Sequence, residues 1–237
     1  MSVQDLKFSV QHKRYALTNS YFKNKQYGAP SDPFEILEYV KEHGHLPYNE
    51  PLCEDWIYLC FVEYQKRAGV YNSQFFTPPS TAKRIAELGN KYFDTRDPYI
   101  LDACCGFGML SKPLIEKGFI VNGFDIDVNF LKIYNYYTEG DFKKSDFREM
   151  GKNSFNSIVS NPPYEIKECT LFIEKLYTWL EDNGIAILLL PKNFIDKDRP
   201  KNLVSILGKF LIIHREDMKE DFERTKIKAE IVVLKKQ

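Results

Sequence analysis

Short apolar runs alternate with amphipathic segments along residues 74–237, and this alternation limits the fold more than any other feature of the sequence. The clearest apolar runs are 99–103, 119–125, 158–160 and 185–191. Continuous apolar runs of this length are typical of strands that are buried on both faces of a parallel sheet. Helices that alternate with such strands indicate a doubly wound sheet. We therefore expect an α/β, Rossmann-like domain over residues 74–237, preceded by a small helical extension over residues 1–73.

Charge and cysteine content narrow the classes of function. Lys and Arg together number 33, as do Asp and Glu, so a general nucleic-acid-binding surface is not indicated. Any such contact needs a local patch, for which the basic region from Lys192 onward is the candidate. Five cysteines without a CxxC spacing predict free thiols and no metal site. With no secretion signal and no membrane-spanning run, we expect a cytoplasmic protein without a membrane partner.

The strongest motif is Asn161-Pro162-Pro163-Tyr164, which directly follows the apolar run ending at Ser160. Each proline fixes φ and lacks an N–H, so the carbonyls of Asn161 and Pro162 stay free at the carboxyl end of the strand. There they suit an amino group conjugated to a ring or a carbonyl, whose two N–H bonds the Asn161 side-chain oxygen and the Pro162 carbonyl would accept. Tyr164 would stack on the ring. Taken alone, an ordinary strand-terminating turn explains the motif equally well.

A second motif, Asp102-Ala103-Cys104-Cys105-Gly106-Phe107-Gly108, ends the first apolar run. Glycine lets the backbone approach a ligand closely, but the third glycine of a dinucleotide fingerprint is missing. A carboxylate at the strand end, from Asp102, suits a cationic group such as the amino-acid end of a sulfonium compound better than a pyrophosphate. The next run ends in Asp125, about 20 residues beyond the glycine turn, where a carboxylate can accept both ribose hydroxyls.

Two weaker signals have both a structural and a ligand-binding interpretation. Asp146 and Phe147 follow a third short strand, and they would hold an adenine amino group and cover its ring. The alternative is a loop acid and a core aromatic residue. The segment Phe75-Phe76-Thr77-Pro78-Pro79 opens an amphipathic helix, for which Thr77 or Ser80 is the expected cap.

In this order, the motifs resemble those of the S-adenosylmethionine-dependent N6-adenine DNA methyltransferases of the gamma arrangement, as in type I modification subunits and fused restriction-modification enzymes. The resemblance covers Gln74 to the C terminus. It implies a seven-stranded sheet whose last strand is antiparallel, with S-adenosylmethionine as the cofactor. The positions that match the cofactor-binding motifs of that family are Phe76, Thr77, Asp102, Cys104, Gly106, Gly108, Asp125, Asp146 and Phe147.

The same resemblance implies the catalytic and substrate-binding residues. The catalytic positions are Asn161, Pro162 and Tyr164, and the substrate-binding positions are Pro163, Phe222 and Lys226. A target adenine would be flipped out of the duplex, and its ring would lie between Tyr164 and Phe222. Positioning would dominate catalysis, and no strong general base is needed, because the methylated nitrogen is already acidic.

The sequence departs from these DNA enzymes because it shows no large target-recognition domain. We therefore expect the N-terminal extension or a separate specificity subunit to read the DNA, unless the substrate is not duplex DNA. One alternative is an RNA N6-adenine methyltransferase, which would use the same Asn-Pro-Pro-Tyr motif. A protein-glutamine methyltransferase is a weaker alternative, because those enzymes usually have a different N-terminal domain. A catalytically silent binding subunit is the last, and the intact motif residues argue against it.

Overall fold

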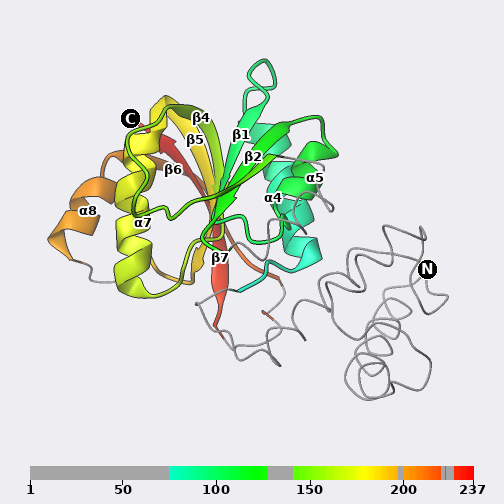
Figure 1. Ribbon diagram of the computed structural model, residues 1–237. Helices are drawn as coiled ribbons and strands as arrows, with labels where there is room; N and C mark the ends of the chain where they lie inside the picture. The colour runs from blue at the N-terminus through cyan, green and yellow to red at the C-terminus, as the bar shows by residue number, and fades with distance from the viewer. Residues whose placement is uncertain (1–74, 128–140, 197–199, 220–221, 223–226) are drawn as a thin grey trace. The chain divides into compact units, whose positions relative to one another are not determined.

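The computed structural model describes residues 75–127, 141–196, 200–219, 222 and 227–237, which are coloured in Figure 1. The expected helical extension over residues 1–73 and the expected substrate contact Lys226 lie outside these ranges. Within the described residues, no helix is both long enough and apolar enough to cross a membrane.

The described strands form one seven-stranded sheet in the order β3-β2-β1-β4-β5-β7-β6. In chain order the strands are β1 (Tyr99–Ala103), β2 (Ile120–Asp125), β3 (Asp141–Lys144), β4 (Phe155–Ser160), β5 (Leu180–Pro191), β6 (Phe210–Asp217) and β7 (Ala229–Lys236). Strands β3, β2, β1, β4 and β5 pair in parallel, whereas β7 is antiparallel to both β5 and β6. This arrangement confirms the expected α/β, Rossmann-like sheet with an antiparallel last strand.

Helices cover both faces of this sheet. The described helices are α4 (Pro79–Tyr92), α5 (Ser111–Ile115), α7 (Ile166–Trp179) and α8 (Lys201–Leu207). Figure 1 shows α7 and α8 on one side of the sheet and α4 and α5 on the other. Each pair of helices closes its own hydrophobic core against the strands.

The central strands β4 and β5 explain why their sequences are continuously apolar. Side chains of consecutive strand residues point to opposite faces, so a strand covered on both sides needs apolar residues at every position. Ile158 and Leu188 belong to the core beneath α7 and α8. Val159 and Ile187 belong to the core beneath α4 and α5. The apolar runs identified in the sequence are therefore the double-sided centre of the sheet.

The expected cap of helix α4 is wrong. Pro78 occupies the N-cap position, and no side chain caps the helix. Pro79 supplies the first helical residue, where proline is favoured because its missing N–H would have no partner there anyway. The hydroxyl of Thr77 instead accepts a hydrogen bond from Asn161, 84 residues further along the chain.

Candidate functional site

The carboxyl ends of β1, β2 and β4 bring the main sequence-predicted residues to one edge of the sheet. Strand β1 lies between the other two and runs parallel to both. Ala103, its last residue, pairs with Phe124 on β2 and Ser160 on β4. Asp125 is the last residue of β2, Asn161 directly follows β4, and the glycine-containing loop leaves β1 between them. Ligands of open α/β sheets bind at this edge.

The loop after β1 takes a backbone conformation that few side chains adopt. Cys104, Gly106 and Gly108 have φ values of 59°, 55° and 95°. The left-handed region is unfavourable for most residues and easy for glycine, which accounts for the two glycines. The backbone N–H of Gly106 points to β2 and donates a 2.8 Å hydrogen bond to Oδ2 of Asp125. Burial raises the pKa of the Cys104 thiol well above its usual value, so this side chain stays protonated.

Asp125 is held by backbone groups on both of its oxygens. Oδ2 accepts the Gly106 N–H, and Oδ1 accepts the Asp127 N–H at 2.9 Å. Burial raises the pKa of Asp125, while these two hydrogen bonds act in the opposite direction. A carboxylate has about four acceptor sites, so each oxygen keeps capacity for a further donor. The geometry is thus compatible with a pair of ligand hydroxyl groups.

Asp102 is fully buried and only half satisfied. Its Oδ2 accepts a 2.5 Å hydrogen bond from the Ser111 hydroxyl, whereas its Oδ1 has no hydrogen-bond partner. Burial raises the pKa of Asp102 to about 7, and the nearby charge of Asp125 also raises it, whereas the bond from Ser111 lowers it. An unpaired buried carboxylate oxygen is costly and therefore unusual. A cationic donor placed beside it would remove this cost.

Exchanging Asp102 for asparagine is expected to stabilise the cofactor-free protein at pH 8 more than at pH 4. The folded-state pKa of about 7 lies above the usual value of 3.8, so the folded state binds more protons than the unfolded state between these pH values. The stabilisation of the wild type by protonation of Asp102 is complete below about pH 4 and is lost as the pH rises through about 7. Asparagine is neutral throughout and removes the loss.

Urea denaturation of wild type and Asp102→Asn at several pH values measures this difference. Asp182→Asn is the matched control, because the Asp182 side chain is 83% exposed. A stability difference between wild type and Asp102→Asn that stays constant from pH 4 to pH 8 would contradict the prediction.

Asn161 has one end of its amide occupied and the other end free. Its Nδ2 donates to the Phe75 carbonyl at 2.6 Å and to Oγ1 of Thr77 at 3.1 Å. Its Oδ1 is buried and has no hydrogen-bond partner. The Phe75 carbonyl can only accept a hydrogen bond, so the Asn161 amide must turn its nitrogen, and not its oxygen, toward Phe75. The arrangement leaves an acceptor oxygen for a donor that reaches the end of β4.

Two aromatic rings, those of Phe75 and Phe222, pack against Tyr164. Its ring centroid lies 5.4 Å from that of Phe75 and 5.6 Å from that of Phe222, and Phe75 and Phe222 are themselves 5.6 Å apart. Tyr164 and Phe222 meet edge to face, so a flat ring would fit between them only after the two rings separate. The Tyr164 hydroxyl is buried without a partner, and burial raises its pKa well above the usual value.

The remaining expected cofactor residues make contacts within the protein. Phe76 packs its ring edge to face on Phe107 of the glycine-containing loop, 4.8 Å between centroids. Asp146 pairs with Arg148, and this partner lowers the pKa of Asp146. Phe147 is 5% exposed and belongs to the hydrophobic core. The assignments of Phe76, Asp146 and Phe147 to the cofactor therefore stay predictions.

Phe75 is the residue that the sequence analysis missed. It lies in the segment that resembles a cofactor motif, but only its two successors were assigned a role. Its carbonyl and its ring both contact the Asn-Pro-Pro-Tyr motif. Its position inside a predicted motif is the sequence signal that could have indicated a role for Phe75.

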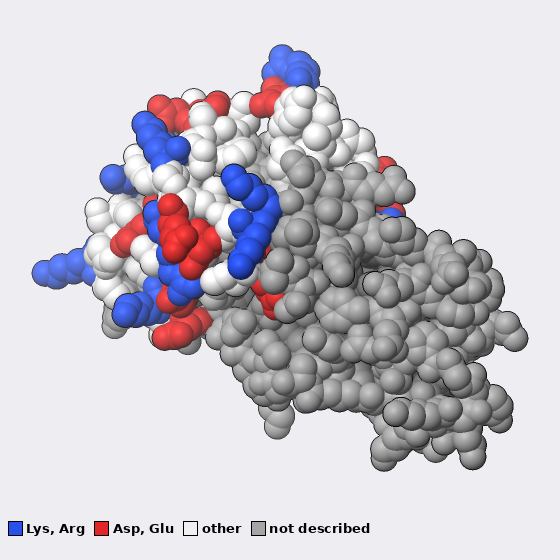
Figure 2. Space-filling model, in the orientation of Figure 1, with Lys and Arg blue, Asp and Glu red and all other residues white. Residues whose placement is uncertain are grey.

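The described residues show neither a continuous basic surface on the face drawn in Figure 2 nor a cluster of metal ligands. On the face drawn in Figure 2, their lysine and arginine side chains are interspersed with aspartate and glutamate side chains. In the predicted basic region, Lys192 pairs with Asp217, and Arg215 pairs with Asp196 and Glu230. Among the residues with described positions, no three His, Cys, Asp or Glu side chains are grouped so as to hold a metal ion.

No family model matches the chain. The distant relatives that match its sequence include two methyltransferases. The type II methyltransferase M.AccI of Acinetobacter calcoaceticus is 24% identical over 208 residues, which cover 72% of this chain and 36% of the relative. The ribosomal RNA small subunit methyltransferase A of Mesomycoplasma hyopneumoniae (strain 232) is 27% identical over 124 residues, which cover 48% of this chain and 46% of the relative. The matched regions are thus less than half the length of each relative.

Among solved structures, a Listeria monocytogenes protein described as a class I S-adenosylmethionine-dependent methyltransferase is similar to this chain with a TM-score of 0.63. The similarity covers 96% of this chain and 88% of that protein, at 13% sequence identity. At so low an identity the likeness concerns the fold. The chain therefore has the Rossmann-like sheet that class I methyltransferases use.

Proposed function

We propose that the chain is an S-adenosylmethionine-dependent methyltransferase that modifies the N6 amine of adenine in DNA. The arrangement of Asn161 carries this proposal. Its amide nitrogen is held by Phe75 and Thr77, and its buried Oδ1 has no partner. The adjacent carbonyl belongs to Pro162, which is followed by a second proline and so precedes a residue without an N–H. In this proposal the Pro162 carbonyl is the second acceptor, so that the site offers two acceptors to one amine.

The chemistry of an aromatic amine explains why two acceptors are needed. The lone pair of such a nitrogen is delocalised into the ring, which makes it a poor nucleophile. Acceptance of both N–H bonds, by Asn161 Oδ1 and the Pro162 carbonyl, favours a pyramidal nitrogen whose lone pair points at the methyl group. The bound cofactor would supply the methyl group: a new N–C bond would form while the S–C bond breaks, and the electron pair of the S–C bond would stay on the sulfur of S-adenosylhomocysteine. The methylated nitrogen then loses a proton to solvent.

The cofactor would bind at the carboxyl ends of β1 and β2. Asp102 has a buried carboxylate oxygen without a partner, which suits the ammonium group of the methionine part. Asp125 would accept the ribose hydroxyls with the capacity left beside its two backbone donors. The positions Phe76, Cys104, Gly106, Gly108, Asp146 and Phe147 complete the proposed cofactor site, to which the resemblance also assigns Thr77. Asp146 would have to share its carboxylate between Arg148 and the adenine.

DNA is the favoured substrate because the match to the type II methyltransferase M.AccI covers 72% of this chain, against 48% for the ribosomal RNA methyltransferase. The second match supports RNA as the alternative nucleic acid. The formal net charge is zero, and Lys192 and Arg215 of the predicted basic region are ion-paired with acidic residues. We therefore infer that another part, residues 1–73 or a separate specificity subunit, contributes to binding DNA.

Transfer of labelled methyl from S-adenosylmethionine tests this proposal. Duplex DNA, single-stranded DNA and total RNA are offered in parallel, with Asn161→Ala as the inactive control. The proposal expects label in DNA from the wild type alone. Label only in RNA would replace the DNA assignment by the alternative. No label in any nucleic acid, with the cofactor still bound, would contradict the proposal and favour a protein substrate or a silent binding subunit.

A further inference from the structure

We propose that Thr77 is a positioning residue for Asn161, an inference that rests on the proposed function of that asparagine. The resemblance assigns Thr77 to the cofactor, yet its hydroxyl oxygen accepts the Asn161 Nδ2–H at 3.1 Å. Thr77 is 3% exposed, so water does not compete for this bond. The threonine would act on the rate of transfer through the asparagine, and not on the affinity for the cofactor.

The hydrogen bonds of the Asn161 amide account for its orientation. An amide nitrogen has two donors, and here one reaches the Phe75 carbonyl and the other reaches Thr77. The carbonyl alone selects which end of the amide faces it. The hydroxyl supplies the second anchor, which fixes the plane of the amide. With both donors engaged, Oδ1 is the free end, and its direction is set before any substrate arrives.

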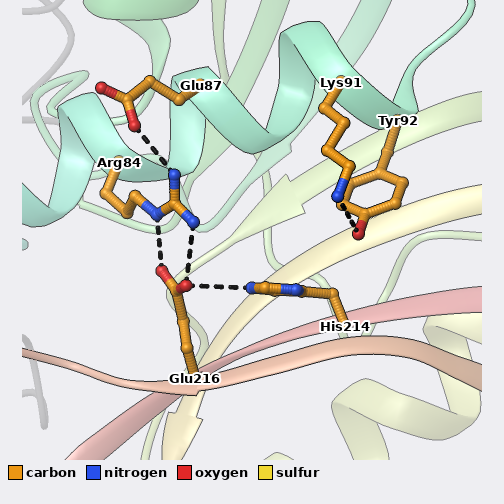
Figure 3. A network of polar contacts seen from close by, with 6 residues as sticks. All are labelled: Arg84, Glu87, Lys91, Tyr92, His214 and Glu216. Carbon is orange, nitrogen blue, oxygen red and sulfur yellow. Dashed lines mark hydrogen bonds and ion pairs between the residues drawn. The ribbon is translucent and has the colours of Figure 1, made fainter.

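The segment that carries both anchors leads directly into a helix that is bonded to the sheet. It opens helix α4, whose first turn is closed by the 2.9 Å bond from the Ala82 N–H to the Pro78 carbonyl. Further along α4, Arg84 donates to both carboxylate oxygens of Glu216 on β6, at 2.7 and 2.9 Å. His214 completes this network at 3.0 Å from Glu216, as Figure 3 shows. The anchors of Asn161 thus directly precede a helix that is bonded to the sheet.

Loss of the Thr77 hydroxyl has a specific consequence for transfer. One Nδ2–H would be left buried without an acceptor, and the amide would be free to rotate about a single remaining bond. Oδ1 would then often miss the substrate amine. A misplacement of about 1 Å in an active site can lower the rate about 100-fold. The binding of S-adenosylmethionine would not depend on this rotation.

Thr77→Val removes the hydroxyl and keeps the shape, so it is the first variant to measure. We expect kcat to fall about 10- to 100-fold, with the Kd for S-adenosylmethionine within about twofold of wild type. Thr77→Ser restores the hydroxyl and most of kcat. Thr170→Val is the matched control, because its buried hydroxyl bonds only to its own helix, at the Ile166 carbonyl.

The outcomes separate this inference from the proposed function. A wild type that transfers no methyl group contradicts the proposed function itself. An active wild type with an equally active Thr77→Val contradicts only the positioning role. A Thr77→Val that loses cofactor affinity as much as it loses rate would return Thr77 to the cofactor site and overturn the inference.

Asn161→Asp is a second test that does not change Thr77. A carboxylate oxygen would then replace the Nδ2 that lies 2.6 Å from the Phe75 carbonyl, and two acceptors would face each other. Only the protonated acid can donate to that carbonyl. We expect the activity of Asn161→Asp, relative to wild type at the same pH, to rise as the pH falls from 8 to 6. A constant ratio would show that the anchors do not orient residue 161.

Discussion

Replacing Asn161 with alanine is expected to lower methyl transfer about 10²- to 10³-fold or more, the range observed when one preorganised polar group is removed from an active site. The alanine variant cannot accept an N–H of the substrate, so the amine keeps its planar, delocalised form. Its effect should appear in kcat, because the interaction is strongest when the nitrogen becomes pyramidal. The affinity for S-adenosylmethionine should stay within about twofold of wild type, since Asn161 does not belong to the proposed cofactor site.

Asn156→Ala is the matched control for this variant. Asn156 lies on β4, the strand that Asn161 directly follows, but its side chain is exposed and donates to Asp97. Its replacement should change transfer little. An Asn161→Ala protein with undiminished transfer would contradict the catalytic role of the Asn-Pro-Pro-Tyr motif, whereas loss of cofactor binding would indicate damage beyond the removed amide.

Replacing Asp125 with alanine should have the opposite signature and weaken the binding of S-adenosylmethionine about 10- to 100-fold, as expected for the loss of hydrogen bonds to a charged group. The variant loses the acceptors proposed for the ribose hydroxyls. It also releases the backbone N–H groups of Gly106 and Asp127, so the glycine-containing loop is held less firmly. At saturating cofactor, a substantial part of kcat should remain.

Isothermal titration calorimetry with S-adenosylmethionine measures this effect. Asp125→Asn is a useful second variant. It keeps one acceptor oxygen, but its amide nitrogen faces one of the two backbone N–H donors and cannot accept from it. We expect its affinity to lie between those of wild type and Asp125→Ala. Unchanged affinity of Asp125→Ala would show that the ribose assignment is wrong.

The α/β sheet class and the placement of the main motifs were predictable because both depend on short-range patterns. A continuous apolar run identifies a strand buried on both faces, and β4 and β5 indeed divide their side chains between two cores. Residues that follow parallel strands meet at one edge of the sheet, which places Asp125 and Asn161 on either side of the loop after β1.

Contacts between residues far apart in the chain were not predictable in the same way. Thr77 was expected to cap a helix or bind the cofactor, and its observed partner is Asn161. The role of Phe75 depends on a carbonyl direction, which no side-chain pattern encodes. Similarly, Asp146 pairs with Arg148 only two residues away, a local contact that competes with the expected adenine. The residues 1–73 and Lys226 keep their predicted roles without a structural description.

Analysis of the methylated nucleoside by mass spectrometry tests the central claim most directly. Genomic DNA without adenine methylation is incubated with the wild-type protein and labelled S-adenosylmethionine, then digested to nucleosides. The proposed chemistry at Asn161 and Pro162 predicts that the label is found in N6-methyl-deoxyadenosine and is absent with Asn161→Ala. Label on a cytosine ring carbon, on a sugar or on protein would contradict the claim that the Asn-Pro-Pro-Tyr motif presents the amine of adenine to the methyl group.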